Sequence, residues 1–346
     1  MSQLQLGLLI LGVAVLLLLA GYGAWQVHRL QPRRAQAPDS FAAALLQAEQ
    51  MQEPVLDANA FDDAHFSLPM PEKKPGLDAL IDVIAAITPD APLNGEVLLA
   101  AMPPTRRVGS KAFAIEALNM ASQRWETPQA GQRYSAMQAG VQLANRSGAL
   151  NNIEFSEFVV KTQGFCDHIN GTPDFPLMRD EVARARELDQ FASDHDAQLS
   201  FILRARRAAW SPSYIQQTAA RLGFVPGVLA GRMVVASNFA GHPPVLSLSF
   251  DTQAALADDP TQSALREVLM SLEVAQVPRG ERAFERMRES ALTLAKEMDG
   301  SITDDNGMAL PAEAMDVIEQ ELEHVYDRLD QRELSAGSPL ARRLFS

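Results

Sequence analysis

The sequence lacks the residue patterns on which most enzymes and secreted proteins depend. It has one cysteine, Cys166, in 346 residues, so no disulfide can form within the chain and nothing indicates an oxidising compartment. No Gly-x-Ser-x-Gly, P-loop or dinucleotide-binding motif occurs. The six histidines are scattered, with no pair at metal-ligand spacing. We therefore expect a protein that is not an enzyme and that holds no cofactor or metal.

Basic residues are also few. The chain has 30 Lys and Arg against 43 Asp and Glu, a formal net charge of -13. Nucleic-acid binders need clustered cations to displace counterions, so we expect no nucleic-acid partner, and nothing indicates a small-molecule substrate. Hydrophobic residues make up 47% of the chain, enough to predict folded cores rather than a disordered polymer.

One long uncharged run stands near the N-terminus. Residues 6–27 read LGLLILGVAVLLLLAGYGAWQV. As a helix this run spans about 33 Å, enough to cross a hydrocarbon core of about 30 Å. Basic residues follow the run and none precedes it, so the positive-inside rule puts the C-terminal side in the cytoplasm. We predict that residues 1–30 form a single-pass membrane anchor. A cleaved signal peptide is disfavoured because the basic n-region and the small-residue cleavage site are missing.

The rest of the chain is predicted to be a linker and two related α+β units. Residues 31–76 are rich in Pro, Gln and Ala and are typical of a spacer. Strand-like and helix-like segments then alternate, and a comparable order recurs. The hexapeptide FPLMRD at Phe175 also matches FERMRE at Phe284. We predict a first unit over 77–195, a second over 196–335, and a tail over 336–346.

Each unit has its own series of predicted elements. For the first we predict a strand in 77–87, a helix over 93–102, paired strands at 111–120 and 134–145, and a helix over 175–191; residues 153–169 fit either helix or strand. For the second we predict strands in 197–205, 232–239, 244–250 and 266–278, helices over 211–224 and 282–298, a turn at 304–307 and a last helix from Pro311; the start of 266–278 also fits a helix.

The C-terminal part of the chain resembles a known family. The resemblance rests on AQVP at 275–278, the helix ERAFERMRESALTLAKEMDG and the following SITDDNGMALPAEAMDVI. This ordered set, over about residues 198–330, is similar to the cytoplasmic domain of the bacterial cell-division protein ZipA. The predicted anchor topology is also ZipA-like, and the resemblance implies that the membrane is the bacterial inner membrane. A weaker echo, LNGEVLLAAM at 93–102, lies in the first unit.

The resemblance implies an antiparallel six-stranded sheet with helices on one face. Its other face would be open and apolar and would bind the C-terminal tail of FtsZ. Alternation puts Leu246, Leu248 and Phe250 under the helices and leaves Ser247 and Ser249 on the open face. The match at AQVP aligns the strand that ends there, and the strands near it, with strands of the ZipA family whose residues contact the FtsZ tail. The predicted partner-binding residues are Leu199, Phe201, Met233, Val235, Ser247, Ser249, Leu272, Val274 and Gln276.

Two functional hypotheses follow from these features. The first is a membrane-anchored adaptor that binds FtsZ and tethers the Z ring to the membrane. The alternative is a membrane-anchored scaffold whose sheet faces are buried and whose partner is another division or envelope protein. That partner would bind helical surfaces such as 319–323 or the Arg204–Arg207 cluster. The two hypotheses differ in whether the sheet faces are open.

Overall fold

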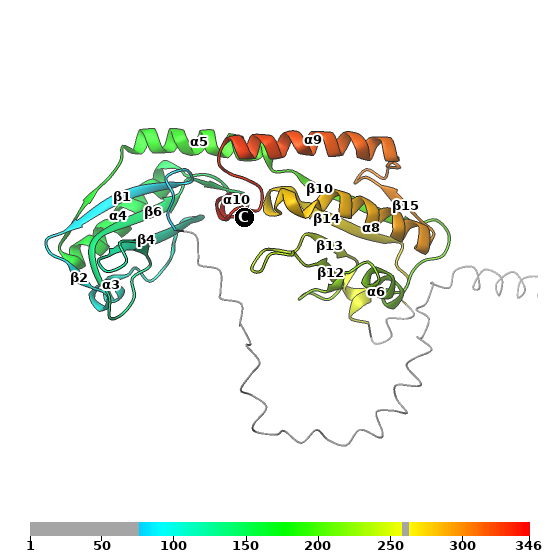
Figure 1. Cartoon of the computed structure of the whole chain (residues 1–346), viewed down its shortest axis with the longest axis horizontal. Coiled ribbons are helices and arrows are strands. Elements are labelled where there is room, and N and C mark those ends of the chain that lie inside the picture. The colour runs from blue at the N-terminus through cyan, green and yellow to red at the C-terminus, as the bar shows by residue number, and fades with distance from the viewer. Residues whose placement is uncertain (1–75, 258–262) are drawn as a thin grey trace, which may run out of the picture. The chain divides into compact units, whose positions relative to one another are not determined.

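The computed structural model describes residues 76–257 and 263–346 (Figure 1). The predicted anchor and almost all of the predicted linker lie outside the described residues. None of the helices in the described part of the chain is long and apolar enough to cross a membrane. The chain is a mixed α+β protein with antiparallel sheets, as predicted. Its described residues form two compact units, which we call the first unit (76–197, 273–280 and 320–346) and the second unit (198–257, 263–272 and 281–319).

The first unit is built on a seven-stranded antiparallel sheet. Its main path runs through β3 (Arg107–Val108), β4 (Lys111–Asn119), β6 (Arg133–Gln142), β1 (Asp82–Pro89) and β9 (Gly171–Asp174); β2 (Leu93–Asn94) pairs with β6, and β5 (Trp125–Glu126) pairs with β4. A small hairpin of β7 (Ala144–Asn145) and β8 (Gly148–Ala149) stands apart from this sheet. The helices are α3 (Gly95–Ala101), α4 (Asn152–Ile169), α5 (Met178–His195) and the C-terminal α10 (Pro339–Leu344).

One face of this first sheet is covered. Phe113, Ile115 and Ala117 alternate along β4 and are buried, whereas Ala112 and Ala114, at positions of the opposite row, are exposed. Phe158 of α4 packs edge-on against Phe113, with their ring centroids 6.1 Å apart. The strand alternation therefore buries one row of side chains under α4 and leaves the other row open.

The second unit is built on a six-stranded sheet. The order is β11 (Val225–Pro226), β12 (Arg232–Val235), β13 (Leu246–Ser249), β14 (Glu267–Glu273), β10 (Gln198–Ala205) and β15 (Gly300–Thr303). The helices are α6 (Pro212–Ala220), the short α7 (Thr252–Ala255), α8 (Ala283–Met298) and the N-terminal part of α9 (Ala312–Gln331). Helix α8 packs on β10 and β15, where Phe284 meets Phe201 edge-on at 6.1 Å.

The two units share a strand order and an element order. The path β3-β4-β6-β1-β9 of the first sheet corresponds to β12-β13-β14-β10-β15 of the second. In both, a long helix ends at a non-glycine residue in the left-handed region, and a glycine then opens the next strand. These pairs are Asn170 (φ 51°) with Gly171 and Asp299 (φ 54°) with Gly300. The repeated topology supports the predicted duplication.

The same comparison corrects the hexapeptide match. The helix that corresponds to α8 is α4, because both precede the strand that pairs antiparallel with the first strand of their unit. Phe175 lies before α5, whose counterpart by position is α9. The match of FPLMRD with FERMRE therefore aligns elements that are not equivalent.

Local sequence signals account for the helix starts. Ser211 accepts a hydrogen bond from the Tyr214 amide, and Pro212 opens α6, as predicted. Residues 153–169, left undecided by periodicity, form α4. Asn151 and Glu154 make a capping box in which each side chain bonds the other's backbone amide. This pair was the signal that favoured a helix.

The division between the units differs from the predicted boundaries within 273–280 and at the C-terminal end of the chain. Residues 273–280, predicted in the second unit, belong to the first. Residues 320–346 belong to the first unit, and the predicted tail 336–346 contains α10 with Leu344 and Phe345 buried. The cause is a set of polar contacts far apart in sequence. Arg343 forms an ion pair with Asp82, and its carbonyl accepts from Gln142.

Candidate functional site

The second sheet has one covered and one uncovered row of side chains. Phe201, Leu248 and Met270 are buried on the side of α8. The alternate residues Ile202, Val234 and Leu269 lie on the opposite side and are half-buried or exposed, with Leu269 38% exposed. We call this surface, formed by Ile202, Val234, Leu269 and the serines between them, the open face of the second sheet.

Serines occupy the middle of this open face. Ser247 lies opposite both Val234 and Ser271 in the ladder, and the Ser247 and Ser271 hydroxyls are 2.7 Å apart. Ser200 donates to Asp305 at 2.6 Å. Because these hydroxyls are hydrogen-bonded to each other or to a carboxylate, they can lie against a partner's apolar groups at a lower desolvation cost.

Most of the predicted partner-binding residues do not lie on this face. Phe201, Met233, Val235, Leu272 and Val274 are buried. The physical reason is the register: Met233 pairs with Leu248 and Val235 with Leu246, and directly paired residues share a face of the sheet. Placing Leu246 and Leu248 under the helices therefore places Met233 and Val235 there too.

The remaining predicted residues divide between the two units. Ser247 and Ser249 are half-buried on the open face, as predicted, and Leu199 is half-buried near the start of β10. Gln276 follows β14 in a 3-10 turn of the first unit, together with Val274, and donates to the Phe345 carbonyl at 2.7 Å. Sequence reasoning missed Ile202, Val234 and Leu269. Their signal was alternation, since each of them lies between two apolar residues that are both buried.

The open face of the first sheet carries a groove of about 730 Å³. Its floor is formed by the small side chains of Ala112 and Ala114, and Trp125, Arg106 and Gln129 are among the residues around it. The two carboxylates there are already engaged. Glu116 accepts from the Leu77 amide and from Gln138, while Glu126 accepts from Asn119 and Tyr134.

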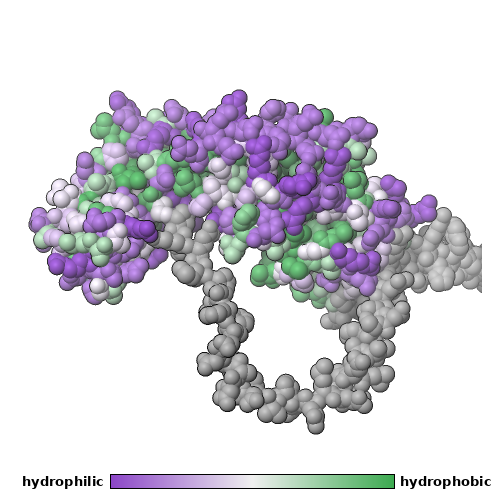
Figure 2. Space-filling model, in the orientation of Figure 1, coloured by the Kyte–Doolittle hydropathy of each residue, from purple (hydrophilic) through white to green (hydrophobic). Residues whose placement is uncertain are grey.

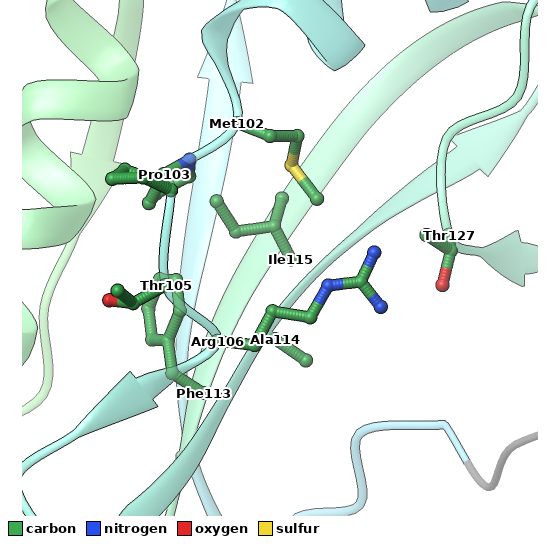
Figure 3. A pocket seen from close by; sticks show the side chains of 9 residues that line it. Met102, Pro103, Thr105, Arg106, Phe113, Ala114, Ile115 and Thr127 are labelled. Atoms are coloured by element: carbon green, nitrogen blue, oxygen red, sulfur yellow. The ribbon is translucent and has the colours of Figure 1, made fainter.

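A smaller pocket of about 240 Å³ adjoins this groove at the edge of β4 (Figure 3). Met102, Pro103, Phe113 and Ile115 give it apolar walls. Arg106 is the charged side chain that lines it, and its guanidinium points toward Thr127 across the opening. Arg106 forms no ion pair with any residue that the structure describes.

The hydropathy of the surface differs between elements. In Figure 2, the visible sides of α5 and α9 are mostly hydrophilic, whereas hydrophobic residues gather around β12 of the second unit. The exposed apolar side chains of that unit include Val225, Val228, Leu229 and Phe239. Phe239 stands on a loop that is firmly held, because the buried Glu281 accepts hydrogen bonds from Ser237 and from the amide of Asn238.

Cys166 and Lys111, two reactive side chains of the first unit, are both buried. Burial raises the pKa of the Cys166 thiol to about 11, so it is protonated and unreactive at neutral pH. Lys111 is buried and donates to Ser110, Asn145 and the Gly148 carbonyl, an arrangement that fixes the β7–β8 hairpin. Within residues 76–257 and 263–346, no cluster of three His, Cys, Asp or Glu side chains could hold a metal ion.

The comparisons with known proteins add no relative. No protein-family model matches the chain, and no curated protein is similar to it at a significant level.

Proposed function

We propose that this chain is an inner-membrane-anchored cell-division adaptor of the ZipA type. In this proposal residues 6–27 cross the membrane with the N-terminus in the periplasm, and the bulk of the chain lies in the cytoplasm. The second unit binds the C-terminal tail of FtsZ and so tethers the Z ring to the membrane. Many anchored copies meeting one polymer would raise the overall avidity well above the affinity of a single contact. The protein acts by binding and has no catalytic role.

The open face of the second sheet carries this proposal. A six-stranded sheet covered by helices on one side is the architecture that the ZipA resemblance implies. Ile202, Val234 and Leu269 give the uncovered side apolar contact points, and Ser247 and Ser249 lie between them. An extended tail lying across the strands would bury these side chains.

The alternative is a membrane-anchored scaffold with a different protein partner. Its distinguishing feature is that the open face would be covered in the assembled protein and unavailable to a peptide. Exposed acidic positions of α9 such as Glu321 and Glu323 would then be the contact surface. The exposure of Leu269 in the described structure favours the adaptor.

A peptide titration separates these two functions. The full-length chain, purified in a mild detergent, is titrated with a fluorescent peptide of the FtsZ C-terminal tail from the same organism. We expect saturable binding that Leu269→Asp weakens at least about tenfold, because a carboxylate would have to be desolvated under the bound tail. The matched control is Leu292→Asp on α8, which changes a leucine of similar exposure (46% against 38% for Leu269) on the covered side of the sheet.

The outcomes are distinct. Binding that is lost only in the Leu269 variant supports the adaptor and locates its site. The absence of saturable binding, or equal loss in both variants, contradicts it. Val274→Asp is unsuitable as a test, because Val274 is fully buried and its replacement would report folding rather than binding.

A further inference from the structure

The outer edge of β4 in the first unit is interrupted. On that side β3 pairs with Lys111 and Ala112, and β5 pairs with Ala117 and Leu118. On this outer edge no described strand pairs with residues 114–116, whose other edge is paired with β6. The Phe113 amide donates outward to the Arg106 carbonyl at 3.0 Å, so alternation turns the next outward backbone groups, those of Ile115, into this gap. We call the gap, bounded by β3 and β5, the β4 notch.

The notch is too short for a strand to run through it. β3 and β5 occupy the same edge on either side, and an added strand normally needs several consecutive residues to pair. A chain can enter from the open groove only with its end. The geometry of the edge therefore selects a chain terminus over an internal segment.

The pocket beside the notch selects which terminus fits. Arg106 is the charged side chain that lines it, and this guanidinium makes no ion pair with a described residue. A terminal carboxylate would complement that cation, whereas a terminal ammonium would be repelled. The exposed Thr127 hydroxyl, on the other side of the opening, can donate a second hydrogen bond to such a carboxylate.

The walls of the pocket select the last side chain. Met102, Phe113 and Ile115 give a dry surface with room for one large aliphatic or aromatic group. The wider groove continues over Ala112 and Ala114, whose small side chains let a backbone approach closely, and Trp125 stands beside it. The preceding residues of the same peptide would lie there.

From these observations we propose that the first unit binds a protein C-terminus that ends in a large apolar residue. The terminal carboxylate is held by Arg106 and Thr127, the last side chain fills the 240 Å³ pocket, and the last amide pairs with Ile115 in the β4 notch. This site is independent of the FtsZ-binding proposal, which concerns the second unit. A chain that failed to bind FtsZ could still carry it.

A generic labelled peptide tests the site, because the proposal specifies the chemistry of the bound C-terminus and not a particular partner protein. The probe is fluorescein-Gly-Ser-Gly-Ser-Ala-Val-Leu with a free C-terminal carboxylate, titrated by fluorescence polarisation into the full-length chain in detergent. We expect C-terminal amidation to weaken binding at least about tenfold, since it removes a charge-assisted hydrogen bond. Any partition of the peptide into detergent would be no weaker for the amide, so it cannot produce this difference.

Two variants complete the experiment. Arg106→Gln is expected to weaken binding of the free-acid probe about tenfold and to abolish the difference between acid and amide. Arg107→Gln, an equally exposed neighbour outside the pocket lining, should change affinity less than twofold. Equal binding of acid and amide, or equal loss in both variants, would overturn the proposal.

A competitor distinguishes a peptide site from a small-carboxylate site. Octanoate supplies a carboxylate and an alkyl chain but no peptide backbone. We expect it to displace the probe only at concentrations far above the probe's own dissociation constant. If octanoate binds as tightly as the peptide, the backbone contributes nothing, and the chain-terminus proposal is wrong.

Discussion

The ion pair between Arg343 and Asp82 fixes the C-terminus of the chain to the first strand of its sheet. Two nitrogens of Arg343 lie 2.6 and 3.0 Å from the Asp82 carboxylate, whose side chain is fully buried. Burial raises the pKa of Asp82 above its usual value, although the neighbouring guanidinium acts to lower it. Asp82 therefore depends on Arg343 to stay ionised inside the unit, and Arg343→Met is the perturbation that tests this dependence.

The size of the effect can be bounded from the proton equilibrium. Removing one partner of a buried pair typically costs about 3–5 kcal/mol. Asp82 can limit the loss by taking up a proton in the folded variant. At pH 7, protonating a carboxyl of ordinary pKa costs about 4 kcal/mol, which is an upper limit here. We expect a loss of about 2–4 kcal/mol at pH 7, because the pKa of Asp82 is already raised in the wild type.

The pH dependence gives the sign of the linkage. In Arg343→Met the folded-state pKa of Asp82 lies above the unfolded one, so the folded state binds the extra proton. The variant then loses stability as pH rises, so its deficit relative to the wild type should shrink on going from pH 7 to pH 5, by at most about 1.4 kcal/mol for each pH unit. Amide hydrogen exchange in peptides covering β1 and α10 of the full-length chain measures these local free energies.

A double variant serves as the control. Asp82→Asn with Arg343→Met leaves no uncompensated charge, and most of the lost protection should return. A deficit below about 1 kcal/mol at pH 7, or one that does not change between pH 7 and pH 5, would refute this account of the C-terminal attachment.

Three further predictions concern other parts of the chain. Glu281→Gln should destabilise the second unit by about 2 kcal/mol, measured by urea unfolding, because a buried carboxylate that accepts from Ser237 and Asn238 is replaced. Burial raises the pKa of Glu281, but those donors and Arg286 lower it more, so the stability that the carboxylate contributes is present above pH 4.5 and is lost as pH falls further. A stability difference between wild type and variant that stays constant at acid pH would contradict this role of Glu281. Glu333→Gly should stabilise the chain by about 1 kcal/mol, since exposed Glu333 has φ 59°, and a lower urea midpoint would count against this reading. Native Cys166 should resist iodoacetamide at pH 8 and react once urea unfolds the chain, because burial raises its pKa to about 11; rapid native labelling would show that the thiol is accessible.

Local chemistry in the sequence was sufficient for most of the secondary structure. The Ser211–Pro212 start predicted α6, and the apolar spacing of 175–191 predicted α5, which spans Met178–His195. These predictions succeeded because capping and helical periodicity involve residues only a few positions apart. For residues 153–169, periodicity alone did not distinguish helix from strand. The Asn151–Glu154 capping box, another local signal, favours the helix that forms there.

The faces of the sheets depended on contacts that no local pattern contains. Met233 and Val235 alternate with their neighbours as in any half-buried strand, and only their pairing with Leu248 and Leu246 shows that they lie on the covered face of the sheet. The β4 notch needs three strands to meet at one edge, and the C-terminal attachment joins residues 82 and 343. The sequence by itself therefore determined the elements and the uncharged N-terminal run, because propensity, capping and hydropathy act over short distances. Only the tertiary structure decided which side chains are open to a partner, because strand register and long-range ion pairs are set by the packing of the whole unit.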